Sequence, residues 1–165
     1  MPVLALLLAA ATPAEAPLEP HLQPLAFLVG SCWRGAFPGG TRTDTHCFTR
    51  TAEGLVRDRH VVAGAARPYS GVTLYRWDAG LGSITFDYDA SDGSHSSGSA
   101  RPAANGLVFP EQTHRTPNGT ETNIRSSWTR DGADAYVALT ESMQGEVWRR
   151  MWEMRMVRIG LAPAE

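Results

Sequence analysis

Asp44 and His46 are the residues whose types and spacing point most directly to chemistry. They lie two positions apart in a segment rich in threonine, so in an extended strand both side chains point to the same side. A carboxylate beside an imidazole can act as an acid–base pair, and burying the two costs free energy unless they are hydrogen-bonded or hydrated. The pair therefore predicts a water-filled pocket, unless it lies solvated at the rim of the fold.

A second charged segment, Arg57-Asp58-Arg59-His60, lies in the next predicted strand. Strand alternation places the two arginines on one side and Asp58 and His60 on the other. Arginines that faced inward could bind a ligand carboxylate, whereas arginines that faced outward would form cross-strand ion pairs in water. The sequence leaves both arrangements open.

A stripe of large side chains lies near the end of the chain. Trp148, Arg150, Trp152, Met154 and Met156 alternate along one long predicted strand and would share a face. Tryptophan and methionine form adaptable apolar walls, and an arginine buried between two tryptophans needs an anionic partner. The stripe predicts a pocket for an amphipathic ligand with an acidic head, with a packed core as the alternative. The other residues expected to line this pocket are Trp33, Phe37, His46, Phe48, Tyr75, Trp77, Phe86 and Tyr88.

The spacing of histidines and cysteines along the chain predicts no metal site. The five histidines are at positions 21, 46, 60, 95 and 114, and the two cysteines form no CxxC motif. A metal site needs three or four converging His, Cys or carboxylate ligands, and no two of these histidines have helical spacing on a plausible helix. We therefore expect neither a metal nor another cofactor.

These side chains must be positioned by strands, because period-2 runs of β-branched and aromatic residues follow one another from residue 31 onward. Gly, Asn and Asp turn signals between the runs indicate short hairpins. The predicted strands are 32–38, 41–50, 55–62, 70–78, 82–89, 94–100, 106–112, 120–130, 134–143 and 146–158. A meander of about eight to ten antiparallel strands removes its edges only by closing into an up-and-down barrel, whose interior can hold one small ligand. The expected fold class is an all-β barrel, with a two-sheet sandwich as the alternative.

The first predicted hairpin fixes a register. If Gly39 and Gly40 are its two central turn residues, Cys32 faces Cys47 and Trp33 faces His46. Directly opposed residues of an antiparallel pair are close enough for a disulfide. We therefore predict a Cys32–Cys47 disulfide, with two buried free thiols as the alternative, and we assign the face that carries Trp33 to the interior.

The composition describes one folded domain. The chain has 165 residues, 42% of them hydrophobic, and a net charge of −2. This length and apolar fraction suffice to bury a core, and the near-neutral charge offers no basic surface for a phosphate backbone. Nucleic acid is therefore excluded as the expected partner. No apolar run reaches the length of a membrane span.

The N-terminus resembles an export signal. Residues Val3 to Ala11 form an apolar run of the length of a signal-peptide core, and Ala14 and Ala16 supply the small residues that precede a cleavage site. We expect residues 1–16 to be a signal peptide and the proline-rich residues 17–24 to be a linker or lid. The mature protein would then be periplasmic or secreted, and it would be cytoplasmic if the run is not a signal.

The stretch Leu25-Ala-Phe-Leu-Val-Gly-Ser-Cys-Trp-Arg-Gly35 resembles the opening of lipocalin-like (calycin-type) domains, in which a short helix precedes a first strand with a Gly-x-Trp signature. The spacing Gly30-x-x-Trp33 is closer to bacterial lipocalin-like families than to true lipocalins. The last predicted strand, through Arg158, also looks like the closing strand of such domains. The resemblance implies a cavity-bearing barrel over residues 25–160, with a short N-terminal helix and a tail at 161–165.

The same resemblance assigns structural and cofactor roles. In calycins an arginine from the last strand covers the signature tryptophan, which implies that Arg158 covers Trp33, with Arg155 as the alternative. Some calycin-like barrels ligate haem through a histidine near the C-terminal end. No histidine follows His114 here, so haem bound in that way is not expected.

Together these patterns predict an exported barrel that binds a small apolar or amphipathic molecule in its interior. One alternative is an enzyme that uses His46 and Asp44 as an acid–base pair in the same cavity. Another is a structural or partner-binding module of the cell envelope. Hydrogen bonding between Asp44 and His46 in a pocket would favour the enzyme, a wholly apolar cavity would favour binding, and a collapsed interior would favour the structural role.

Overall fold

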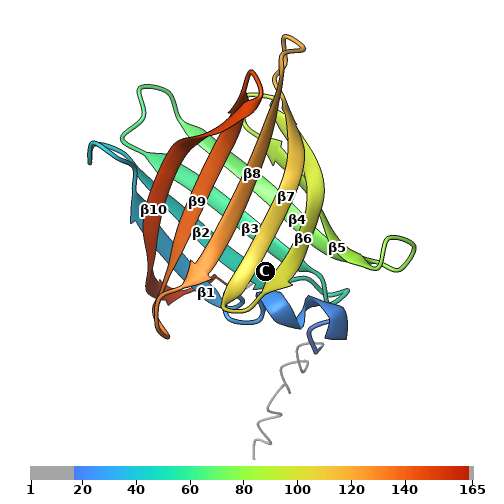
Figure 1. Ribbon diagram of the computed structural model, residues 1–165. Helices are drawn as coiled ribbons and strands as arrows, with labels where there is room; N and C mark the ends of the chain where they lie inside the picture. Colours follow the sequence, from blue (N-terminus) through green and yellow to red (C-terminus); the bar gives the residue numbers. More distant parts are fainter. Residues whose placement is uncertain (1–16, 164–165) are drawn as a thin grey trace, which may run out of the picture.

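The chain folds into a closed, antiparallel up-and-down β-barrel in a computed structural model that describes residues 17–163 (Figure 1). Each strand pairs with its neighbours in sequence, and the last strand pairs with the first. The elements are the 3-10 helix η1 (Pro20–Leu25) and the strands β1 (Ser31–Ala36), β2 (Thr43–Arg50), β3 (Val56–Ala63), β4 (Tyr69–Asp78), β5 (Ser83–Ala90), β6 (His95–Ala103), β7 (Gly106–Arg115), β8 (Glu121–Arg130), β9 (Ala135–Gln144) and β10 (Val147–Leu161).

The prediction of an all-β barrel is confirmed, and the sandwich alternative is excluded by the closing β1–β10 pair. All ten predicted strands are present, with ends that differ by a few residues. The alternation of side chains explains the agreement, because β3 for example buries Val56, Asp58, His60 and Val62 and turns the residues between them outward. The predicted signal peptide, residues 1–16, lies outside the described residues.

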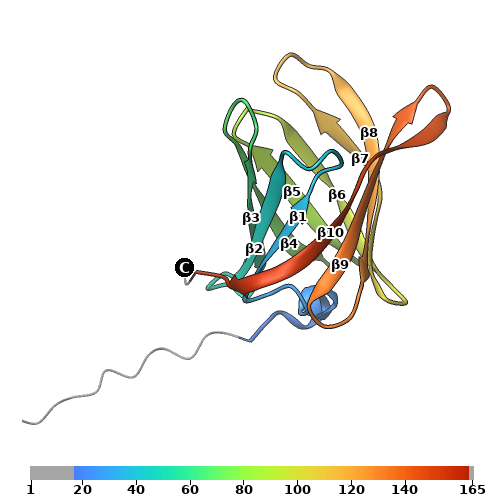
Figure 2. The same cartoon turned by 90° about the vertical axis from the view of Figure 1, so that its left-hand side faces the viewer.

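One end of the barrel is closed by the segment before β1, which crosses the lower end in Figures 1 and 2. Leu22, Leu25 and Leu28 of this segment are fully buried, and the Glu19 amide donates to the carbonyl oxygen of Gly54. Within residues 17–24, Leu22 and Glu19 thus attach this part of the chain to the barrel. The three leucines hold the segment in place because they bury apolar surface against the core.

Trp33 and Arg158 complete this closed end. The Trp33 ring is 1% exposed, and the guanidinium carbon of Arg158 lies 4.9 Å from its centroid. Arg155 instead pairs with Asp131, with 2.6 Å between nitrogen and oxygen. The placement of Arg158 over Trp33 is therefore confirmed, and Arg155, the alternative, does not take this position. Cation–π attraction favours the observed arrangement.

The register of the first hairpin is also confirmed. Cys32 pairs with Cys47 and Trp33 with His46, and the two cysteines form a disulfide with 4.0 Å between their Cα atoms. This bond links β1 to β2 next to the closed end. No helix among residues 17–163 has the length and apolar character required to cross a membrane.

Candidate functional site

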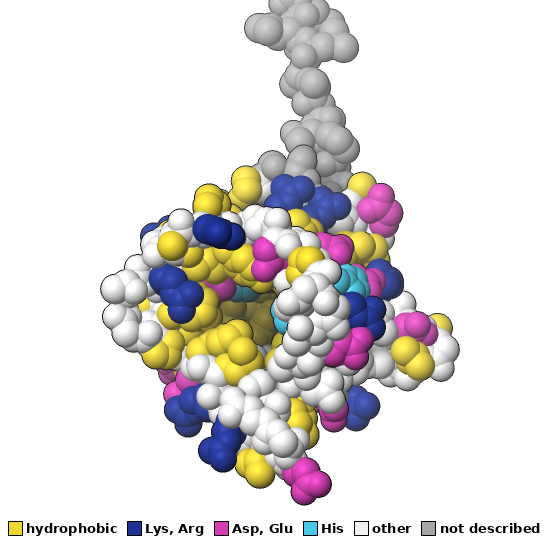
Figure 3. Space-filling view, turned by 90° about the horizontal axis from the view of Figure 1, so that it is seen from above, with side chains coloured by type: hydrophobic (Ala, Val, Ile, Leu, Met, Phe, Trp, Pro, Cys, Tyr) yellow, Lys and Arg dark blue, Asp and Glu magenta, His cyan; other side chains and the backbone are white. Residues whose placement is uncertain are grey.

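A cavity of about 640 Å³ occupies the interior above the core. Its rim includes Phe37, Pro38, Arg42 and Ala65, which lie on the loops opposite the closed end. Seen from that side, the molecule is hollow, and hydrophobic side chains surround an opening within which histidine is visible (Figure 3). This volume falls in the range of small-molecule sites. The interior is therefore not collapsed, which removes the observation that would have favoured a purely structural role.

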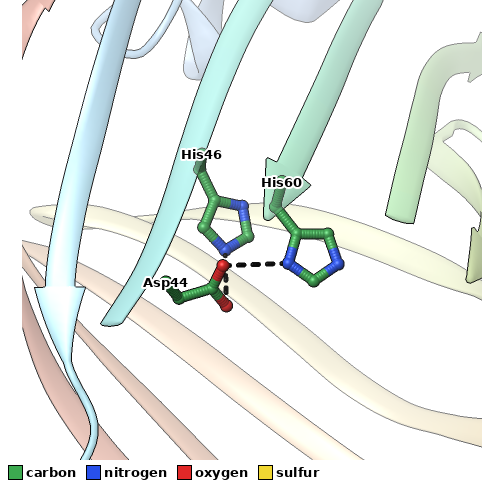
Figure 4. Close-up of side chains that lie close together, drawn as sticks. All are labelled: Asp44, His46 and His60. Carbon is green, nitrogen blue, oxygen red and sulfur yellow. Dashed lines mark hydrogen bonds and ion pairs between the residues drawn. The ribbon is translucent and has the colours of Figure 1, made fainter. Parts of the chain in front are cut away.

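The polar wall of the cavity, as we term it, is formed by Asp44, His46, Asp58, His60 and Tyr88. His46 and His60 are directly opposed on β2 and β3, and their ring centroids are 4.8 Å apart. The Asp44 carboxylate lies 3.2 Å from Nε2 of His46 and 3.0 Å from Nδ1 of His60 (Figure 4). Nδ1 of His46 lies 2.7 Å from the second carboxylate, that of Asp58. Two carboxylates thus hold two imidazoles side by side.

The polar wall continues toward the rim through two tyrosines. Nε2 of His60 lies 3.0 Å from the Tyr88 hydroxyl, which lies 2.8 Å from the Tyr69 hydroxyl. Gly71 makes room for this contact, because a Cβ atom at that position would lie 2.7 Å from both His60 Nε2 and the Tyr88 oxygen. The result is a hydrogen-bonded series that runs from Asp58 through His46, Asp44, His60 and Tyr88 to Tyr69 at the rim.

Electrostatics fix the charges at the inner end of the series. Burial alone would raise the pKa of the Asp44 carboxyl, but hydrogen bonds and charge attraction from His46 and His60 hold it well below its usual range. Burial alone would lower the pKa of His46, but the charge of Asp58 and hydrogen bonds to both carboxylates raise it to about 10. At neutral pH, His46 is therefore an imidazolium between two carboxylates.

The two tyrosines remain neutral at the outer end, because burial raises the pKa of both the Tyr88 and the Tyr69 hydroxyls. The Asp44 carboxylate carries no proton, so Nδ1 of His60 must donate to it. When His60 is neutral, its Nε2 accepts a hydrogen bond from Tyr88, whose oxygen accepts one from Tyr69. The Tyr69 oxygen is then the last atom of the series, and at the rim it is a hydrogen-bond acceptor.

The opposite side of the cavity carries a group of apolar residues, which we term the apolar wall. It comes from β7 to β10, whereas the polar wall comes from β2 to β5. The same strands also place polar side chains on the cavity, those of Gln112, His114, Ser126 and Thr140, and Ser126 is hydrogen-bonded to Thr140. The members of the apolar wall are the aliphatic and aromatic residues of these strands. They are Phe109, Ile124, Trp128, Ala138, Met151, Trp152, Met154 and Met156.

Several residues predicted to line the pocket do border the cavity: Phe37, His46, Tyr75, Phe86, Tyr88, Trp152 and Met154, together with Asp44. Trp33 and Phe48 are instead packed in the core beneath it. Trp77 stacks on His21 near the closed end, with ring centroids 4.2 Å apart. These three residues were predicted to line the pocket because parity gives the side of a strand but not the height along the barrel.

The prediction that Trp148 and Arg150 share a face with Trp152 is wrong. Arg150 pairs with Glu141 and Trp152 with Thr140, so β10 has a bulge at the residue between them. The extra residue reverses the alternation. Trp148 lies under the exposed Arg125, and Arg150 forms an exposed ion pair with Glu153, so neither residue borders the cavity.

Asp58, His60 and Tyr69 are site residues that the sequence pattern does not predict. Strand alternation places Asp58 and His60 on the same side of β3, but it does not say whether that side faces the interior. The register of β2 against β3 would have found them, because it sets His60 directly beside His46. No pattern in the sequence fixes that register before the hairpin is built.

No protein-family model matches the chain, and no curated protein has a similar sequence. The closed antiparallel barrel is consistent with the calycin-like fold that the opening and closing segments implied. The cavity and its polar wall are therefore the features that bear on function.

Proposed function

We propose that the barrel binds a small amphipathic molecule in its interior. The observation that carries this proposal is that a single cavity contains both the polar wall on β2–β5 and the apolar wall on β7–β10. An apolar group that displaces water from Trp152 and Met154 gains hydrophobic free energy. A polar group on the same molecule can hydrogen-bond to the opposite wall, which fixes its orientation.

The polar group of the ligand is a hydrogen-bonding group rather than the acidic head that Arg150 suggested. Arg150 lies outside the cavity, and Arg57 and Arg59 are on the outward face of β3. Arg42 borders the rim, where its guanidinium carbon lies 4.9 Å from the Phe37 centroid. Asp44 and Asp58 place two buried carboxylates on the inner polar wall, and these would repel an anion beside them.

Acid–base catalysis is the alternative use of the same cavity, and the 3.2 Å separation of Asp44 and His46 is the arrangement it requires. Efficient proton transfer needs a group whose pKa lies near the working pH. The carboxylates raise the pKa of His46 to about 10, so at neutral pH its ring offers no free lone pair as a base. Ligand binding therefore accounts for the polar wall better than catalysis by this pair.

Export is the second part of the proposal. The Cys32–Cys47 disulfide supports it, because such bonds persist in oxidising compartments such as the periplasm or the extracellular space. The apolar run at Val3–Ala11 supplies the expected signal. Amino-terminal sequencing of the protein secreted by its own host would show whether the chain is cut near Ala16.

The binding proposal is tested with N-phenyl-1-naphthylamine, a neutral apolar amine whose fluorescence rises in apolar surroundings. The full chain in EDTA should bind one equivalent. Trp152→Glu places a charge on the apolar wall and should weaken binding at least about tenfold. Trp148→Glu makes the same change four positions earlier, outside the cavity, and should leave binding unchanged.

Equal affinity in both variants, or no fluorescence rise with the unaltered chain, would refute binding in the cavity. Native mass spectrometry of the protein purified from its own host gives an independent readout. A co-purifying molecule that N-phenyl-1-naphthylamine displaces would identify the natural ligand.

A further inference from the structure

We infer that Asp44, His46 and His60 form a binding site for a divalent transition-metal ion, with Zn²⁺ or Co²⁺ as its simplest occupants. This inference goes beyond the proposed ligand binding and does not depend on it. Each of these three residues offers one ligand atom, and the three atoms lie within 4.8 Å of one another, close enough to hold one ion. The scattered positions of the histidines along the chain predict no metal site. The pairing of β2 with β3 nevertheless places His46 directly beside His60.

The first observation is the direction of the donor atoms. The two imidazole rings are inclined by only 19° to each other, and each turns one nitrogen toward the Asp44 carboxylate between them (Figure 4). The nitrogen–oxygen separations are 3.2 Å for His46 and 3.0 Å for His60. Ligand atoms at ordinary zinc distances in a tetrahedral site lie about 3.4 Å apart. A small withdrawal of the carboxylate would therefore open a place for the ion.

The second observation concerns the other nitrogen of each ring. Nδ1 of His46 is held by Asp58 at 2.7 Å, and Nε2 of His60 is held by Tyr88 at 3.0 Å. Histidines that ligate metals almost always have the non-ligating nitrogen bonded to a carboxylate or other partner, which sets the tautomer and the ring orientation. Both histidines here have that support already, from residues that are not themselves ligands.

Charge and access also fit a divalent ion. Asp44 and Asp58 are buried, and one divalent cation would balance the charges of their two carboxylates once His46 has released a proton. On binding, the ion takes the place of the proton on Nε2 of His46, and that proton leaves to solvent. The three ligands come from the cavity wall, so a water molecule or a ligand group can complete the coordination from the open side. Two imidazoles and one carboxylate suit zinc, cobalt or iron rather than magnesium or calcium.

Binding would also reverse the hydrogen bonds toward the rim. With the ion on Nδ1 of His60, the ring proton moves to Nε2 and donates to the Tyr88 oxygen. Tyr88 then donates to Tyr69, whose own hydroxyl proton becomes free to donate into the cavity. The metal would thus change the group presented at the rim from an acceptor to a donor.

The test uses the full-length chain with its disulfide intact, stripped with EDTA and then freed of EDTA. Titration with Co²⁺ should produce a visible absorption band that saturates at one ion per chain, and Zn²⁺ should abolish the band. Asp44→Asn, His46→Gln and His60→Gln should each weaken Zn²⁺ binding at least about 100-fold, as loss of a direct ligand must exceed the 10–100-fold typical of outer residues. Asp58→Asn should weaken it less than these three.

The matched control is His95→Gln. His95 Nδ1 also lies against a carboxylate, that of Asp89, at 2.9 Å, but this pair is exposed and outside the cavity. The control should bind both ions as the unaltered chain does. Circular dichroism of each variant verifies folding, and a variant that does not fold is replaced by NMR of the unaltered chain. In that spectrum, Zn²⁺ should shift the imidazole nitrogens of His46 and His60 but not those of His95.

Absence of a Co²⁺ band together with absence of these imidazole shifts would overturn the inference. So would binding that the three ligand variants leave unchanged. The naphthylamine experiment is run in EDTA, so failure of metal binding and failure of ligand binding are separate outcomes.

Discussion

His46 and Asp58 contact each other diagonally across the β2–β3 pair, with 2.7 Å between Nδ1 and the carboxylate oxygen. With Asp44 on its other nitrogen, His46 is a charged ring held between two carboxylates inside the barrel. Removing either partner of such a contact leaves a buried charge without its counter-charge, which is strongly destabilising. The polar wall therefore contributes to folding stability as well as to the character of the cavity.

The first prediction concerns alkaline pH. The pKa of His46 is raised from 6.5 to about 10 on folding, so its stabilising contribution is complete below pH 6.5 and is lost as pH rises toward 10. The free energy of unfolding, measured by urea denaturation in EDTA, should fall across this window. His46→Gln should be less stable at pH 6.5 and should have a flatter pH dependence. The same slope in both proteins would contradict this assignment of charge.

The second prediction concerns the closed end. Arg158→Met removes the cation that lies 4.9 Å from the Trp33 centroid and should lower the free energy of unfolding by about 0.5–1 kcal/mol. Arg155→Met, which removes an exposed pair with Asp131, should cost about 0–0.5 kcal/mol. Urea denaturation at one pH compares the two. A larger loss for Arg155→Met would reverse their assigned roles.

The third prediction concerns the disulfide. Cys32 and Cys47 are 15 positions apart, and replacing both with alanine should lower the free energy of unfolding by about 3 kcal/mol, chiefly because the unfolded chain gains freedom. A reductant should destabilise the unaltered protein by a similar amount. It should have no effect on the double variant, which serves as its control. Insensitivity of the unaltered protein to reductant during unfolding would show that the bond is absent.

The fourth prediction concerns Gly71. Its missing side chain lets His60 and Tyr88 meet, and a Cβ atom there would lie 2.7 Å from atoms of both. Gly71→Ala should lower the free energy of unfolding by about 1–3 kcal/mol, the usual cost of overpacking. Gly80→Ala changes a glycine in the exposed β4–β5 turn, where the nearest atom is an Asp78 oxygen at 3.2 Å, and should change stability by less than about 0.5 kcal/mol. Similar values for the two variants would mean that the hydrogen bond between His60 and Tyr88 does not form.

The sequence alone predicted the number of strands, their up-and-down order, the Cys32–Cys47 pair and the inward side of Asp44 and His46. Each of these depends on local patterns: alternation within one strand, or the register of a hairpin whose turn residues are evident from Gly39 and Gly40. The prediction that Arg158 covers Trp33 followed from the resemblance to calycin-type domains, and the structure confirms it.

The tertiary structure decided the rest. The bulge between Arg150 and Trp152 cannot be recognised from the pattern of residue types in the sequence. Its one extra residue nevertheless turns Trp148 and Arg150 away from the cavity. The meeting of His46 with His60 depends on the register between two strands whose connecting loop has no decisive turn signal. Alternation gives the side to which a residue points, but only the paired and closed barrel gives its height and its neighbours, and these determine which side chains form a site.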